Sequence, residues 1–293
     1  MDPGKFLLFT MGGLADAAYL FIVAAGLSLV FGALRVINMA HGSLYMVAAF
    51  VVVVVANQLG GGIGFLPALL LAVLVAALVG VVIEIVVLKR IYGQEHLVQL
   101  LATYAVSLVI AGGVRIVFGV NYRIVAAPIS GHVSVLGYNY SLYSLLMIGA
   151  AVLIAAGVWL LMFRTPLGRN IRAAVSDPEL LNASGVNVTR LYTIVFAIGA
   201  GLAGLGGVIV APSQAVNGTM DTDVLVLAFA ISVIGGLGSI IGSAVGAVIV
   251  GLVISFGLVN PVTNNFALAF VFIIMVVVLT IRPWGLFGTP EQT

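Results

Sequence analysis

The stretch IGFLPALLLAVLVAALVGVVIEIVVL, residues 63–88, has one charged residue, Glu84, among its 26 positions. A helix needs about 20 consecutive, mostly apolar residues to cross the hydrocarbon layer of a membrane, because no water there can satisfy free backbone groups. Residues 63–88 meet this requirement. The stretch therefore predicts a membrane-spanning helix.

Composition extends this prediction to the whole chain. Of the 293 residues, 63% are hydrophobic and 7% are charged, against roughly a quarter charged in ordinary soluble domains. A water-soluble fold is excluded. Together with residues 63–88, seven further apolar runs predict eight full spans. These runs occupy residues 7–33, 39–57, 97–118, 142–163, 191–211, 240–259 and 264–281.

A ninth apolar piece, residues 224–234, is 11 residues long and ends at the sequence GGLGS, residues 235–239. It has about half the length of a span, so we expect a broken or re-entrant helix there. The predicted fold is all-α, a polytopic integral membrane protein of about 8–9 transmembrane segments. We expect residues 1–293 to form a single transmembrane domain.

The distribution of basic residues predicts the orientation, because lysine and arginine are enriched in short cytoplasmic loops. If residues 164–190 are cytoplasmic, eight of the 11 basic residues lie inside and three lie outside. The N-terminus is then predicted outside and the C-terminus inside. The eight are Arg35, Lys89, Arg90, Arg164, Arg169, Arg172, Arg190 and Arg282, and the three are Lys5, Arg115 and Arg123.

The cytoplasmic loop is predicted to contain two short helices. Thr165 is an N-cap residue, and Pro166 after it favours the first helical position. Leu167 and Ile171 then recur at helical spacing. The first helix should therefore start at Pro166.

The same pattern repeats in the second half of this loop. Asp177 can cap a helix that begins with Pro178 and Glu179, and Gly185 can end it. Isolated helices this short are marginal in water. We therefore expect the pair to dock on the body of the protein or on a cytoplasmic partner.

If the pair docks on a partner, the first helix must provide both the buried and the peripheral residues of the contact. Leu167 and Ile171 would then be the buried anchors, with Arg169 and Arg172 at the rim of the contact. Docking on the body of the protein would instead bury the same apolar side chains within this chain.

Several kinds of chemistry are excluded or left without a signal. The chain has no G-x-x-x-x-G-K-[ST] loop, no H-E-x-x-H and no G-x-S-x-G motif, so nucleotide binding, if required, falls to another polypeptide. It has no cysteine, which excludes disulfides and thiolate metal sites. The net charge of +2 is spread between apolar runs, and no nucleic-acid partner is expected.

One G-x-G-x-x-G match, Gly199, Gly201 and Gly204, lies inside an apolar run and follows no predicted strand. A dinucleotide site needs a strand before these glycines. Glycines also let membrane helices approach closely. We interpret this match as a helix-packing surface.

Polar residues in or near the membrane have two open interpretations. Asn38, His41 and Gly42 stand at the start of the second run. Asn38 can satisfy free amides at a helix start, or these residues can belong to a pathway or gate, as costly polar groups in membranes often do. Glu84 lies close to Lys89 and Arg90 in sequence, which favours local pairing. Asp16 faces an outer vestibule or the interface.

Three blocks together resemble LivH-type permeases of branched-chain amino acid ABC importers. The first comprises GLSLVFG (26–32), INMAHG (37–42) and Met46. The second is TPLGRNIRA (165–173) with Asp177-Pro178-Glu179 and Gly185-Val186-Asn187. The third is GGLGS (235–239) with Gly242 and Gly246-Ala247.

The resemblance implies roles for these residues. The second block corresponds to the segment that couples the family to its ATPase, here Thr165, Pro166, Leu167, Gly168, Arg169, Ile171, Arg172, Asp177, Pro178, Glu179 and Gly185. The first and third blocks are expected to contribute to the translocation pathway or its gate, through Asn38, His41, Gly42, Gly235, Gly236 and Gly238.

It also implies a setting in the bacterial inner membrane. The expected partners are a second, homologous LivM-like permease subunit, two cytoplasmic ATPase subunits and a periplasmic solute-binding protein. ATP and Mg would be used by the ATPases, and this chain would bind no cofactor and catalyse no reaction. The solute is a branched-chain amino acid or a related amide, urea or aromatic acid. The alternatives are an ion-coupled secondary transporter and a passive channel.

Overall fold

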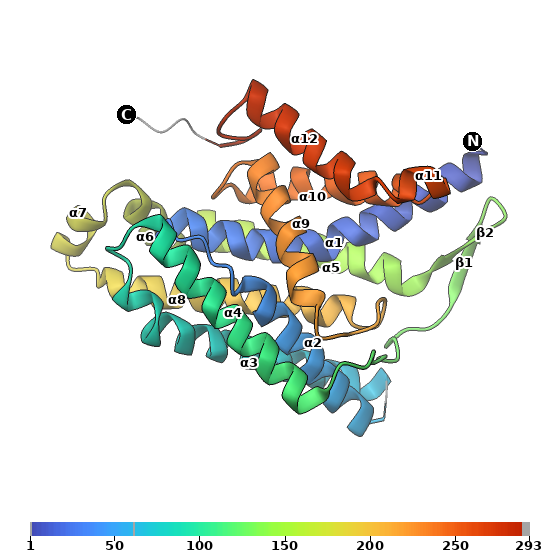
Figure 1. The fold of residues 1–293 in the computed structure, drawn as a ribbon, viewed down its shortest axis with the longest axis horizontal. Coiled ribbons are helices and arrows are strands. Elements are labelled where there is room, and N and C mark those ends of the chain that lie inside the picture. The colour runs from blue at the N-terminus through green and yellow to red at the C-terminus, as the bar shows by residue number, and fades with distance from the viewer. Residues whose placement is uncertain (1, 61, 289–293) are drawn as a thin grey trace.

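The protein is described by a computed structural model that covers residues 2–60 and 62–288. It is almost entirely helical (Figure 1). The long helices are α1 (Pro3–Leu34), α2 (His41–Gln58), α3 (Gly62–Val86), α4 (His96–Phe118), α5 (Leu142–Arg164), α8 (Val188–Val210), α9 (Met220–Gly235), α10 (Ile240–Gly257) and α12 (Ala267–Ile281). The short ones are η1 (Leu88–Arg90), α6 (Pro166–Ser176), α7 (Pro178–Ala183) and α11 (Pro261–Asn264).

In this part of the chain, seven helices are long and apolar enough to cross a membrane. They confirm the predicted polytopic all-α fold. The last predicted span, residues 264–281, is shorter in the structure, because α12 has 15 residues and begins at Ala267, after the short helix α11 that ends at Asn264. Asn260 and Pro261 start α11, and the Asn260 side chain accepts a hydrogen bond from the Val262 amide at 3.0 Å.

The short apolar piece is longer than predicted. Helix α9 has 16 residues and begins at Met220, four residues before the apolar run. Its first turn contains Asp221 and Asp223, which hydropathy counts against a membrane segment. Carboxylates in a first turn are nevertheless favourable, because they face the positive end of the helix dipole. In Figure 1, α9 lies across α1 instead of alongside it.

Helix α1 forms the centre of the bundle. Every residue from Ala17 to Val30 is buried, and the helix packs against α8, α10, α5 and α9. An apolar helix that is buried on all sides belongs to the interior of a bundle. Helices α3, α4, α5 and α12 surround it and expose many large apolar side chains, as helices in contact with lipid do.

Glycines set the closest helix crossings. A Cβ added to Gly26 in α1 would lie 2.7 Å from the Gly199 carbonyl oxygen in α8. One added to Gly204 would lie 2.6 Å from the Ala76 Cβ in α3. The interpretation of the G-x-G-x-x-G match as a packing surface is confirmed.

The outer loop between α4 and α5 contains a β-hairpin. Strands β1 (His132–Val135) and β2 (Tyr138–Ser141) pair antiparallel. Leu136 and Gly137 join them, with φ of 53° and 81°, as a two-residue hairpin turn of right-twisted strands requires. The hairpin lies at the end of the bundle where α1 begins, opposite α6 and α7 (Figure 1).

This arrangement gives the predicted orientation a direct test. A topology reporter fused after residue 91 or 187 should report the cytoplasm, and one inserted at residue 131 should report the periplasm. Accessibility of an enzyme reporter in intact cells measures this. A cytoplasmic signal from residue 131 would invert the orientation.

Candidate coupling and translocation site

The two predicted cytoplasmic helices begin where their caps place them. The Thr165 hydroxyl accepts a hydrogen bond from the Gly168 amide at 3.1 Å, and α6 starts at Pro166. The Asp177 carboxylate accepts one from the Leu180 amide at 2.9 Å, and α7 starts at Pro178. Because each cap satisfies otherwise free amides, the pair keeps a defined shape at the end of the bundle.

Past α7 the chain turns at Gly185, which has φ of 89°, a conformation that glycine adopts without steric cost. Its amide donates to the Asn182 carbonyl at 3.0 Å. Asn187 then caps α8 by accepting a bond from the Arg190 amide at 2.9 Å. The coupling segment therefore leads directly into a long helix of the bundle.

The inner face of α6 belongs to this chain. Gly168, Ile171 and Ala174 are buried, and α6 packs against α5, α1 and α8. Ile171 is 2% exposed, and Leu167 is half-buried against the same core. The expectation that these two side chains anchor the helix in a partner is therefore corrected. The inner face of α6 therefore docks on the body of this protein and not on a cytoplasmic partner.

The outer face of the pair remains free for a partner. Leu180 is 64% exposed in the first turn of α7, directly after the exposed Pro178 and Glu179. Arg169 is exposed on α6. An exposed leucine on a capped, rigid projection is a suitable anchor for a protein contact.

The glycine-rich block forms a break between α9 and α10. Gly236 and Gly238 have φ of 105° and 85°, values that disfavour every side chain other than hydrogen. Ser239 ends the break and caps α10 by accepting a hydrogen bond from the Gly242 amide at 3.0 Å. Gly235 lies in backbone contact with Gly242. The predicted broken helix is confirmed as a structural feature.

The C-terminal segment, residues 282–288, completes this break. The Leu286 and Phe287 amides donate to the Ile234 and Gly235 carbonyls, each at 2.9 Å. These carbonyls end α9 and have no partner within the helix. The segment therefore acts as the C-terminal cap of α9 and holds the break in place.

A cluster of buried serines lies beside the break. The Ser28 hydroxyl is 2.7 Å from that of Ser243 and donates to that of Ser232 at 3.2 Å. All three are 0% exposed, and they join α1, α9 and α10. Sequence reasoning missed this cluster, because single serines in apolar runs have no spacing that marks them.

The first block occupies a different part of the bundle. The Asn38 side chain accepts a hydrogen bond from the Ala40 amide at 3.1 Å, so it stabilises the turn before α2. The His41 Nε2 atom lies 3.0 Å from the Val23 carbonyl oxygen. Gly42 lies against the Asp221 backbone. Asn38 and His41 are buried, and the Asn38 Nδ2 and His41 Nδ1 atoms have no hydrogen-bond partner among the described residues.

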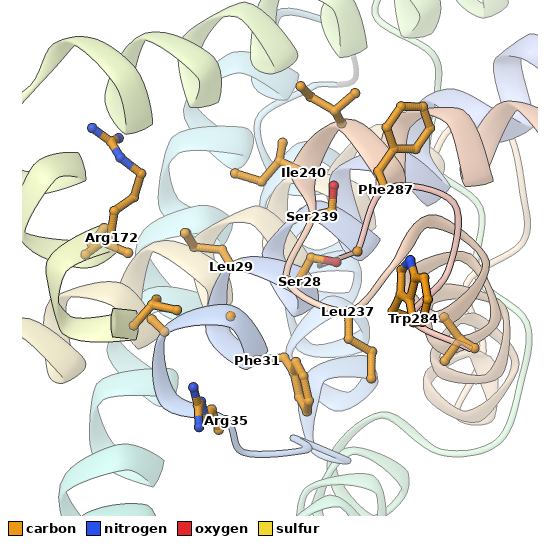
Figure 2. A pocket seen from close by; sticks show the side chains of 18 of the residues that line it. Ser28, Leu29, Phe31, Arg35, Arg172, Leu237, Ser239, Ile240, Trp284 and Phe287 are labelled. Atoms are coloured by element: carbon orange, nitrogen blue, oxygen red, sulfur yellow. The ribbon is translucent and has the colours of Figure 1, made fainter. Parts of the chain in front are cut away.

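A cavity of about 900 Å³ connects the second and third blocks (Figure 2). Ile171 and Arg172 from α6 line it together with Gly238 and Ser239 from the break. The C-terminal end of α1 contributes side chains that include Ser28, Phe31 and Arg35, and the C-terminal segment contributes Trp284 and Phe287. The coupling segment and the break therefore share one space, which does not include Asn38, His41 or Gly42.

Comparison with known proteins identifies the family. The model of the permease component of branched-chain amino acid transport systems matches residues 9–279. The chain belongs to this permease family. It is a multi-pass inner-membrane protein, as the seven apolar helices also indicate.

Relatives match the permease over nearly its full length. The permease protein BraD of Pseudomonas aeruginosa is 26% identical, over 98% of this chain and 97% of its own. LivH of Escherichia coli K12 is 25% identical, over 98% and 96%. The probable LivH of Methanocaldococcus jannaschii is 28% identical, over 98% and 94%. No solved structure matches.

Glu84 of the permease is placed differently from the sequence interpretation. Its carboxylate accepts hydrogen bonds from the Tyr92 and Thr193 hydroxyls, each at 2.8 Å, instead of pairing with Lys89 or Arg90. Burial and the bond to Glu84 raise the pKa of the Tyr92 phenol, so it remains a donor. The carboxylate, which is 0% exposed, therefore joins α3 to the start of α8.

Replacing Glu84 by leucine should destabilise the permease. The Tyr92 hydroxyl would lose its acceptor, at about 1–3 kcal/mol, whereas the Thr193 hydroxyl would keep the Thr189 carbonyl at 3.2 Å. The melting temperature of the purified protein measures the loss. Glu84→Gln, which keeps acceptor capacity, should lose less, and Glu179→Gln on exposed α7 should change nothing. An unchanged melting temperature for Glu84→Leu would contradict the assignment.

Proposed function

We propose that this permease forms half of the membrane pore of an ABC importer for branched-chain amino acids or a related small solute. The main support for this proposal is that the α6–α7 pair has one buried face and one exposed face. One face is buried in the bundle through Ile171, and the opposite face presents Leu180 at the surface. Such a pair can transmit a push from a cytoplasmic partner into the membrane helices.

A displacement of the α6–α7 pair would reach the membrane helices through the contacts of α6. Helix α6 packs against α1, α5 and α8, and its Arg172 lines the same cavity as the α9–α10 break. Packed helices move as discrete bodies, because their interfaces do not deform continuously. A displacement of α6–α7 therefore changes the space between α6 and the break. This is the coupling step of an alternating-access mechanism.

The remaining parts of the importer are other polypeptides. Two cytoplasmic ATPase subunits bind ATP and Mg, and a homologous LivM-like permease subunit supplies the second half of the pore. A periplasmic binding protein delivers the solute at the end where the β1–β2 hairpin lies. The relatives BraD and LivH, permease proteins of high-affinity branched-chain amino acid transport systems, support branched-chain amino acids as the substrate class.

One observation favours an ion-coupled secondary transporter instead. Asp221 is 6% exposed in the first turn of α9, and the Ser43 hydroxyl donates to its carboxylate at a long 3.4 Å. The sequence reasoning missed this carboxylate, because it placed the start of the helix at residue 224. A weakly bonded, buried carboxylate in a membrane protein is a candidate for cation coupling.

Affinity purification in mild detergent separates the two proposals. An ABC permease should co-purify with a second permease subunit and with ATPase subunits, and the complex should hydrolyse ATP. A secondary transporter should purify without an ATPase. Recovery of the chain without any ATPase, from cells that express the whole operon, would contradict the importer proposal.

A further inference from the structure

The cavity between α6 and the α9–α10 break has charge of one sign. Arg35 and Arg172 line it with their permanently charged guanidinium groups, and no aspartate or glutamate is among its lining residues. Arg35 and Arg172 are both exposed, as is His96, which also lines the cavity. The cavity therefore attracts an anion.

Arg35 stands in an unusual conformation at this cavity. It is the C-cap of α1, with φ of 53° and ψ of 29°, where helices commonly place glycine. An L-residue with a bulky side chain pays roughly 1–2 kcal/mol for this left-handed conformation. A glycine would avoid that cost, so the strained residue points to a use for its guanidinium group.

The mouth of the cavity is apolar. Phe163, Leu237, Ile241, Trp284 and Phe287 surround it and are 49%, 40%, 55%, 44% and 49% exposed. Figure 2 shows Arg35 and Arg172 on one side of the cavity and Trp284 and Phe287 on the other. A ligand that fits this surface combines an anionic group with a large apolar part.

The position of the cavity matches a lipid headgroup region. It lies at the end of the bundle where α1 ends and α6 begins, the end predicted to be cytoplasmic. On α1 the lining of the cavity begins at Ser28, seven residues before Arg35. At 1.5 Å per residue, the cavity therefore extends about 10 Å from Arg35 into the bundle along the helix axis. Tryptophan and arginine are the usual residues at this depth.

We propose that the cavity binds an anionic phospholipid of the inner leaflet. The phosphate contacts the Arg35 and Arg172 guanidinium groups, and the acyl chains cover the apolar mouth. Basic pockets between membrane helices on the cytoplasmic side bind anionic headgroups in this way. A small soluble anion would leave the mouth uncovered, and an apolar protein helix would leave the guanidinium groups without a counter-charge.

The test uses the intact transporter complex in nanodiscs. Phosphatidylcholine nanodiscs with 20% phosphatidylglycerol are compared with phosphatidylcholine alone, on the order of the charge of an anionic leaflet. Native mass spectrometry counts the retained lipids, and the melting temperature is measured in both. Phosphatidylglycerol should remain bound and raise the melting temperature by several degrees. The double variant Arg35→Gln, Arg172→Gln should lose both effects.

A matched control and a second readout keep this result interpretable. Arg169→Gln, on α6 outside the cavity lining, should retain both effects. For the purified permease alone, in a Trp159→Phe background that leaves Trp284 as its one tryptophan, brominated phosphatidylglycerol should quench the fluorescence more than brominated phosphatidylcholine does, and this requires no change at the arginines. Equal quenching by the two lipids would overturn the proposal. So would an equal melting-temperature rise with soluble glycerol phosphate or leucine, or retention unaffected by the double variant.

Discussion

Uptake should be abolished when leucine replaces Gly236 or Gly238. Both glycines have positive φ in the α9–α10 break. A Cβ at Gly236 would meet the Gly288 backbone and lie 2.9 Å from the Trp284 carbonyl oxygen, and one at Gly238 would lie 3.0 Å from the Gly32 Cα atom. Backbone cannot yield as a side chain does, so the variants must displace the C-terminal segment or α1.

The same positions should also reject alanine, with a smaller loss of uptake. Left-handed backbone costs roughly 1–2 kcal/mol for a residue with a Cβ. Gly157→Ala in α5 is the matched control, because no atom lies within 4 Å of its added Cβ. Solute uptake by cells that express each variant measures the effect. Wild-type uptake by both leucine variants would remove the support for a functional break.

A charge placed on α7 should separate coupling from stability. Leu180→Asp should reduce co-purification of the ATPase by at least tenfold, because exposed anchors of this kind contribute roughly 2 kcal/mol or more to a contact. The melting temperature of the permease alone should not change. Ile171→Asp should lower that melting temperature strongly, since it buries a charge at a cost of several kcal/mol.

The two substitutions control each other, because both add one carboxylate to the coupling segment. Lys89→Ala, an exposed change at the same end of the bundle, should alter neither measurement. Loss of ATPase binding only in the destabilised Ile171→Asp variant would contradict a docking role for α7.

Much of the fold could be predicted because membrane helices are specified by length and hydropathy. The cap residues Thr165 and Asp177 further predicted the first residues of α6 and α7, since a local side chain decides where a helix starts. The start of α9 was missed for the opposite reason. Asp221 is polar by hydropathy but favourable at a helix N-terminus, and only the contact with α2 shows that it is buried.

The sequence was sufficient to predict which segments form the site, but not which side chains contact each other there. The break itself follows from the sequence, because an apolar piece too short for a span ends in the glycine-rich stretch of residues 235–239. The partner of Glu84 does not follow from it. The nearest charges in sequence are Lys89 and Arg90, whereas the donors are Tyr92, in the turn after η1, and Thr193, on α8. Likewise, the spacing of Ile171 marks an apolar face without saying which surface that face meets.

The most direct test of the importer proposal is solute uptake by proteoliposomes that contain the purified complex. The measurement supplies ATP inside and a soluble binding protein with radiolabelled leucine outside, and omits each in turn. We expect accumulation of leucine only when both ATP and the binding protein are present, with no response to an imposed proton or sodium gradient. Accumulation driven by either gradient without ATP would contradict it.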